Sequence, residues 1–170
     1  LPKAGKMDVI VRSAAELGAD TIIPFVAARS VSRVTGEKSA MKAARWQIIA
    51  REAARCCRNS QITDVLPVAS FDDMLARATG HALKMIFWEE EDQKGIKDIL
   101  SDPEVAEVKD IFVIVGPEGG FSRDEISQAK KAGFISVSLG KQILKVETAA
   151  LVIISIIQYE RGIFGSTARR

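Results

Sequence analysis

The stretch that decides the fold is DIFVIVGPEGGFSRDEI, residues 110–126. A run of five apolar residues stands directly before a loop that holds a proline, a glutamate and two adjacent glycines. An apolar run without alternation predicts a strand covered on both faces, as the central strands of a parallel sheet are. Ser122 and Glu125 have the spacing of a capping box, and Phe121 and Ile126 have that of a hydrophobic staple. A helix is therefore expected to begin right after the glycines.

The loop of residues 116–120 is the first candidate for a binding site. Because it follows a parallel strand, it is expected at the carboxyl edge of the sheet, where ligands bind in open α/β sheets. Its glycines permit positive φ and let a ligand approach the main chain. The spacing fits neither the G-x-G-x-x-G nor the G-x-x-x-x-G-K-[ST] fingerprint, which disfavours a nucleotide-phosphate cradle. On these residues alone, the loop could also be a plain tight turn between strand and helix.

The rest of the chain alternates apolar runs rich in Val and Ile with helical patterns. This alternation predicts an α/β fold with a mostly parallel central sheet, and the absence of repeats and linkers predicts one domain over residues 1–170. The expected strands are residues 21–26, 62–68, 82–89, 110–116 and 134–140. The expected helices are residues 6–18, 37–57, 71–78, 94–100 and 123–133, with a last helix from about 147.

Composition limits the class of protein. With 47% hydrophobic and 27% charged residues, the 170-residue chain can bury one sizeable core. No apolar run reaches the length of about 18 residues that a bilayer span needs, and a secretion signal is not evident, so a cytoplasmic protein is expected. Cys56 and Cys57 are adjacent and His81 is the only histidine, so no metal site is expected.

Charge is distributed unevenly along the chain. The net charge is +2, but residues 1–60 hold eleven Lys and Arg against five Asp and Glu. A basic first third suggests an acidic partner such as nucleic acid, although solvated surface side chains are the commoner cause of such counts.

A second unusual stretch is LGKQILKVETAALVIISII, residues 139–157. Ile143 and Leu144 are apolar residues in a loop, where they either plug the end of the core or contact a ligand. After Thr148 the helical pattern is apolar nearly all round, so this helix must be buried in a core or against another subunit.

Together the two stretches resemble the ribosomal RNA uridine-N3 methyltransferase family, which belongs to the SPOUT class of knotted methyltransferases. The family pattern runs GPEGG-hydrophobic-S-x-x-E and then LG-x-R-I-L-R-T-E-T-A, and this chain reads GPEGGFSRDE and then LGKQILKVETA. The segments KMDVIVRSAAELGADTIIPF and ARWQIIAREAA are similar to the family as well. The resemblance thus extends from about residue 6 to residue 161.

The resemblance implies a SPOUT-type α/β knot, that is, a deep C-terminal trefoil knot, with S-adenosylmethionine bound among the knot loops. It also implies a homodimer with the last helix in the interface. The family's N-terminal PUA-like β-barrel, which helps to bind RNA, is expected to be absent from residues 1–170. The implied cofactor-binding residues are Trp88, Glu89, Gly116, Pro117, Glu118, Gly119, Gly120, Leu139, Gly140, Ile143 and Leu144.

The implied activity is methylation of N3 of a uridine in the 16S ribosomal RNA of the small subunit. Such a reaction needs alignment of donor and acceptor rather than a metal, and the target base must be unpaired or flipped out. Glu118, Glu147 and Lys145 are the catalytic candidates by motif position. The two carboxylates could instead cap a helix or hold a neighbouring cation.

Arginines and departures from the family pattern bear on RNA binding. Arg51, Arg55 and Arg58, at i, i+4 and i+7, predict one RNA-binding helix face, although a solvated face has the same pattern. A similar stripe is formed by Lys38, Lys42 and Arg45. Positions that depart from the family are Gln142 and Lys145 for arginine, Val146 for threonine, Cys56 for glutamine and Arg58 for glycine. Two alternatives therefore stay open: a SPOUT methyltransferase with another RNA target, and a non-catalytic dimeric RNA-binding factor.

Overall fold

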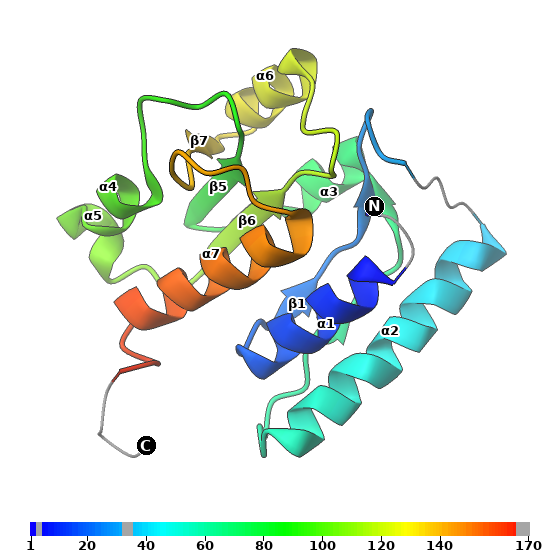
Figure 1. The fold of residues 1–170 in the computed structure, drawn as a ribbon. Coiled ribbons are helices and arrows are strands. Elements are labelled where there is room, and N and C mark those ends of the chain that lie inside the picture. The colour runs from blue at the N-terminus through cyan, green and yellow to red at the C-terminus, as the bar shows by residue number, and fades with distance from the viewer. Residues whose placement is uncertain (3–4, 32–35, 166–170) are drawn as a thin grey trace.

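The computed structural model describes residues 1–2, 5–31 and 36–165. Helices and strands alternate along the chain (Figure 1). The helices are α1 (Lys6–Glu16), α2 (Glu37–Cys56), α3 (Phe71–Arg77), α4 (Ile96–Leu100), α5 (Pro103–Ala106), α6 (Arg123–Lys131) and α7 (Val146–Glu160). The strands are β1 (Thr21–Ile22), β2 (Phe25–Val26), β3 (Asp64–Val65), β4 (Ala69–Ser70), β5 (Leu83–Phe87), β6 (Ile111–Val115) and β7 (Ile135–Val137).

The main sheet has three strands in the order β6-β5-β7, all parallel. Two shorter parallel ladders pair β1 with β3 and β2 with β4. Every pairing among the described strands is parallel, which confirms the expected α/β class with a parallel sheet. Among the described residues, no helix combines the length and the apolar character that crossing a membrane would require.

The position of β6 in the sheet differs from the expectation of a central strand. The central strand is β5, and β6 pairs with β5 alone in the described ladders. Both faces of β6 are nevertheless covered. Ile114 belongs to one apolar cluster, while Val113 and Val115 pack against another. The unbroken apolar run correctly predicted that both faces of β6 are buried. Helices and loops can cover these faces, so burial does not require a neighbouring strand on each side.

Prolines break the first two expected strands. Residues 21–26 form β1 and β2 with Pro24 between them, and residues 62–68 give β3, which ends before Pro67. Proline has no N–H to donate to a ladder, so pairing is interrupted where it stands. The Pro24 carbonyl still accepts a hydrogen bond of 2.8 Å from the Ala69 N–H, which keeps the two segments side by side.

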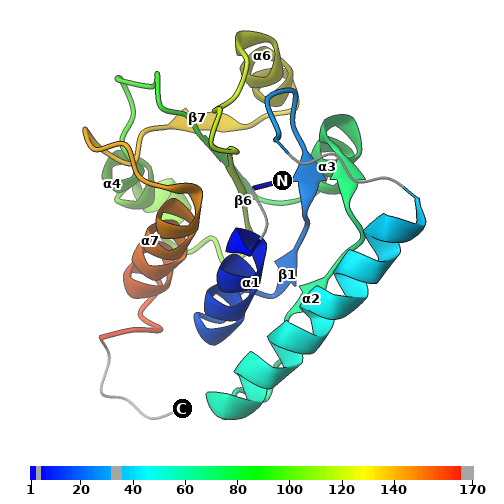
Figure 2. The same ribbon diagram turned by 45° about the vertical axis from the view of Figure 1, so that its right-hand side comes forward.

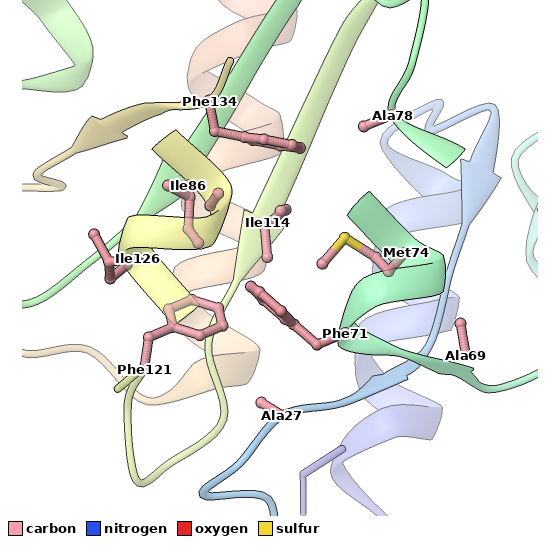
Figure 3. Close-up of a cluster of buried hydrophobic side chains, with 11 residues drawn as sticks. Ala27, Ala69, Phe71, Met74, Ala78, Ile86, Ile114, Phe121, Ile126 and Phe134 are labelled. Carbon is pink, nitrogen blue, oxygen red and sulfur yellow. The ribbon is translucent and has the colours of Figure 1, made fainter. Parts of the chain in front are cut away.

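A core cluster fixes the helix that follows the glycine loop. Figure 3 shows Ile114 of β6 between Ile126 of α6 and Met74 of α3. Phe121, the residue just before the helix cap, is 1% exposed in this cluster, and its ring centroid lies 6.0 Å from that of Phe71. Burial of Phe121 and Ile126 in one cluster is the staple that the sequence predicted.

Helices α1 and α7 lie side by side and are tied at both ends (Figures 1 and 2). At the first end, Lys6 Nζ lies 3.4 Å from Glu147 Oε2. At the other, Gln158 Nε2 donates to the Leu17 carbonyl at 2.8 Å. Along its length α7 contributes the fully buried Ile153 to the cluster beneath β5 and β7. Helix α7 is therefore tied to α1 at both of its ends and packs on the sheet between them.

Candidate active site

Three loops meet at one edge of the main sheet. Because the strands are parallel and Phe87 pairs with both Val115 and Val137, the three strands end level with one another. The loops that follow, residues 88–95, 116–122 and 138–145, thus leave the sheet at its carboxyl edge. Main-chain hydrogen bonds also join the first loop to the last, such as Ser138 N–H to the Lys94 carbonyl at 2.8 Å. The structure thus brings together the three segments that contain the expected cofactor-binding residues.

The glycine loop is packed tightly against the protein itself. Gly120 has φ of 67°, and its N–H donates to the Pro117 carbonyl at 2.9 Å. A Cβ on Gly120 would lie 1.7 Å from Glu89 Oε1. A Cβ on Gly119 would lie 3.0 Å from the Cβ and 3.1 Å from the carbonyl oxygen of Arg29. These glycines are needed because protein atoms occupy the space of a side chain, and not only because a ligand could approach, as the sequence suggested.

The main chain of residues 118–119 is open on its other side. The Glu118 side chain is only 23% exposed, although the residue as a whole is exposed, as is Gly119. The backbone of Glu118 therefore contributes to its accessible surface. Pro117 and Gly120, which flank this pair, are buried. Peptide groups at the tip of a rigid loop are thus accessible to a bound molecule.

The capping box after the loop is confirmed, and it has a third partner. Ser122 Oγ accepts from the Glu125 N–H at 3.2 Å, and Glu125 Oε2 accepts from the Ser122 N–H at 2.9 Å. Glu125 Oε1 accepts a further bond of 2.8 Å from the Ala28 N–H. The Glu125 carboxylate is buried, and these donors offset its loss of water. The result is a loop anchored to both α6 and the segment around Ala28.

Lys6 is the site residue that sequence reasoning missed. Its Nζ lies 3.0 Å from Glu118 Oε1 and 3.4 Å from Glu147 Oε2, so one cation joins the loop after β6 to the first turn of α7. The side chains of Lys6, Glu118 and Glu147 are 30%, 23% and 22% exposed. The hydrogen bond to Glu118 raises the pKa of Lys6, against an opposing effect of desolvation, and Glu147 contributes in the same direction. Lys6 is therefore charged at neutral pH.

This bridge bears on the three catalytic candidates. Glu118 and Glu147 are brought together on one cation, which is the second of the two roles left open for them. Both carboxylates therefore contact Lys6, which fixes the loop after β6 against the first turn of α7. Lys145 is exposed at the N-cap position of α7, next to the bridge but outside it. The geometry thus favours positioning over proton transfer for the two glutamates.

The apolar side chains of the third loop, residues 138–145, differ in their exposure. Ile143 is 90% exposed, so it is not a plug for the core, whereas Leu139 packs against the cluster beneath β7 and Leu144 is half-buried. Gly140 has φ of 120°, and a Cβ there would meet nothing within 4 Å. A side chain at Gly140 would thus have free space, whereas protein atoms fill the side-chain space at Gly119 and Gly120.

The first of the three loops, residues 88–95, begins at the end of β5 with Trp88 and Glu89. Trp88 is half-buried against the core, and its main-chain N–H donates to the Val137 carbonyl at 3.1 Å. Glu89 is exposed, with its carboxylate over Gly120. The two residues therefore link the first loop to the other two.

The proposed RNA-binding helix face is only partly formed. Arg51, Arg55 and Arg58 are all exposed, but α2 ends at Cys56, so Arg58 is not on the helix as expected. Arg58 has φ of 52°, a left-handed turn closed by the Asn59 N–H to the Ala54 carbonyl at 2.9 Å. Such a position after a helix suits glycine, the residue usual in the family pattern.

Two of the basic side chains in these stripes are paired with acidic side chains of the protein. Arg55 pairs with Glu52 at 2.9 Å, and Arg45 of the second stripe is paired with Asp8. Within the described part of the chain, no group of three or more His, Cys, Asp or Glu side chains could hold a metal ion.

Comparison with known proteins places this chain in a family. The model of the family described as RNA methyltransferase domain matches residues 1–158. The ribosomal RNA small subunit methyltransferase E of Bacillus subtilis is 33% identical over 162 residues, which cover 94% of this chain and 63% of the relative. The crystal structure of the enzyme of that name from Neisseria gonorrhoeae, bound to S-adenosyl methionine, matches with a TM-score of 0.82 and 31% identity over 94% of this chain and 62% of that one.

A candidate methyltransferase from Legionella pneumophila, in complex with the cofactor SAM, matches with a TM-score of 0.84, 31% identity and coverage of 94% and 63%. The chain thus spans somewhat less than two thirds of the length of these relatives. The resemblance seen in the two sequence motifs is confirmed by a match that extends over nearly the whole of the chain. This chain belongs to the RNA methyltransferase domain family.

Proposed function

We propose that this chain is the catalytic part of a small-subunit ribosomal RNA methyltransferase, which transfers a methyl group from S-adenosylmethionine to N3 of a uridine in 16S RNA. The observation that carries the proposal is the convergence of three loops at the carboxyl edge, with Lys6 joining two of them. The relatives named for this activity or solved with this cofactor match over the same residues. Such a substrate would be met in the cytoplasm.

The residues at this edge fit S-adenosylmethionine. When bound, the cofactor supplies a methyl group already activated by a sulfonium. Exposed peptide groups of residues 118–119 can hydrogen-bond its polar parts. The exposed Ile143 offers apolar surface, and the open space beside Gly140 leaves room for a ligand. These features support the cofactor role assigned to the glycine loop and to residues 139–144, with Trp88 and Glu89 at the third side.

The roles of the charged residues follow from their contacts. Glu118 and Glu147 would fix the loop and α7 relative to each other through Lys6, so that a bound donor and a flipped-out base are aligned. Lys145 would remain available at the mouth of the site for the RNA. The proton of uridine N3 would then leave to water or to a group of the substrate complex.

The proposed cofactor and activity can be tested by calorimetry and by nucleoside mapping. The protein should bind S-adenosylmethionine, and small-subunit RNA from cells without the gene should lack one N3-methyluridine that the intact gene restores. No binding at millimolar cofactor would favour the non-catalytic RNA-binding factor. Binding together with loss of a different modified nucleoside would favour a SPOUT enzyme with another target.

A homodimer through α7, with that helix threaded as in a trefoil knot, completes the proposal. Leu151, Val152 and Ile154 are half-buried and stand outside the apolar clusters formed by the described residues. Such a surface on an apolar helix is suited to pairing with a second copy. Ile154→Glu is expected to convert a dimer into a monomer in sedimentation analysis. Met41→Glu, at an apolar residue of α2 that is 73% exposed, is the control and should remain dimeric; a monomeric wild type would contradict the dimer.

A further inference from the structure

A shallow depression lies beside the candidate active site, between α6 and the end of β5. Its volume is about 640 Å³. The lining residues are Trp88, Arg123, Ile126, Ser127, Lys130 and Lys131. Five of them come from one face of α6. The sixth, Trp88, follows β5 and begins the first of the three loops of the candidate active site. The depression therefore borders the carboxyl edge where the three loops meet.

The depression combines positive charge with an aromatic ring. Three of its six lining residues are cationic and none is acidic. Lys130 Nζ lies 6.0 Å from the centre of the Trp88 ring. Arg123 contacts Glu90 at 3.4 Å, but these side chains are 85% and 47% exposed. An exposed pair of this kind is weak, so another anion could replace Glu90.

We propose that this depression binds the single-stranded RNA next to the target nucleotide. Arg123, Lys130 and Lys131 would contact its phosphates, and a base would lie against the ring of Trp88. Basic side chains beside an aromatic ring are the arrangement that proteins use to hold single strands. An acidic peptide would use the cations but not the ring. The inference rests on the proposed function, because it takes RNA to be the substrate.

The depression lies next to the edge of the sheet where a target base would be methylated. A uridine that is unpaired for methylation has to be held by its neighbours in the strand. Since Trp88 belongs both to the depression and to the edge of the sheet, RNA bound on α6 would lead directly into the site. Of the arginines expected to bind RNA, Arg51 and Arg55 lie on α2 and Arg58 follows its end, and α2 lies away from α6 (Figures 1 and 2). The depression is thus a second, nearer contact surface.

The test is a pair of matched charge reversals. In Lys130→Glu/Lys131→Glu, affinity for a single-stranded fragment of small-subunit RNA, measured by fluorescence anisotropy, should fall about tenfold or more. The slope of log K against log salt should become shallower by about 0.7 for each phosphate that the variant no longer neutralises. The control is Lys97→Glu/Lys109→Glu, which reverses two exposed lysines elsewhere and should weaken binding much less. A second variant, Lys130→Gln/Lys131→Gln, should show a smaller decrease and serves if reversal disturbs folding, which thermal melting detects.

Calorimetry with S-adenosylmethionine separates failure of this inference from failure of the proposed function. Unchanged cofactor affinity with weakened RNA binding supports the inference. Equal RNA affinity in the wild type and in both α6 variants, equal decreases in the α6 and control variants, or no RNA binding by the wild type, would overturn it. Absence of cofactor binding in the wild type would overturn the proposed methyltransferase and leave the RNA result to be judged by itself.

Discussion

Lys6→Met is expected to lower affinity for S-adenosylmethionine by at least about tenfold, because the two segments that it joins would lose their alignment. Without the cation, Glu118 and Glu147 would face each other in a partly buried place, and two like charges there repel. The loop after β6 and the first turn of α7 would move apart, and the cofactor would lose the alignment of two walls. Calorimetry measures the affinity, and transfer of labelled methyl to small-subunit RNA measures the activity.

Two further variants show whether charge is the cause. Lys6→Arg keeps the cation and should retain most of the affinity. In Lys6→Met/Glu118→Gln/Glu147→Gln, the two neutral amides no longer repel each other, so part of the affinity should be recovered, as a coupled set of residues requires. Wild-type affinity in Lys6→Met would show that the bridge does not support the site.

Gly119→Val is expected to abolish measurable cofactor binding and to lower the free energy of unfolding by about 1–3 kcal/mol, the usual cost of inserting atoms into a packed place. Its Cβ would lie 3.0 Å from the Arg29 Cβ and 3.1 Å from the Arg29 carbonyl oxygen. Since a main-chain atom cannot turn aside as a flexible side chain can, the loop itself must shift. Calorimetry and thermal unfolding report the two effects.

Arg29→Ala is the control for this substitution. It removes the hydrogen bond of 3.2 Å from Arg29 Nη1 to the Gly119 carbonyl but introduces no close contact. Its effect on cofactor affinity should be small, because the donor is exposed. If Arg29→Ala costs as much as Gly119→Val, the missing hydrogen bond and not the crowding would be responsible.

Features of the site that depend on near neighbours in the sequence were predictable. Ser122 and Glu125 are three residues apart, so the capping box could be recognised from spacing, and the structure confirms both of its hydrogen bonds. The Lys6 bridge could not be found in this way. Its partners stand on two distant segments of the chain, and a single lysine before a helix has no periodic pattern. Only the folded arrangement brings the three charges together.

Some features of the strands and of α2 could likewise be predicted from the sequence, and others could not. The apolar run of β6 correctly indicated burial on two faces, but it carried no information about which strand would stand at the centre of the sheet. The strand expected over residues 21–26 is divided around Pro24, which has no N–H to donate to a ladder. The spacing of Arg58 was misleading. It fitted one face of α2, yet this helix ends at Cys56, two residues earlier, and Arg58 has a left-handed backbone conformation after it.

The pairing of α1 with α7 governs when this site can exist during synthesis of the protein. Gln158 meets Leu17 across 141 positions of the chain, and strands β1 to β7 all lie between them. On the ribosome, the first helix emerges long before its partner has been translated, and closing so long a span is slow. Every new molecule therefore passes through a period in which the strands of its sheet can pair but α7 is not yet bound to α1.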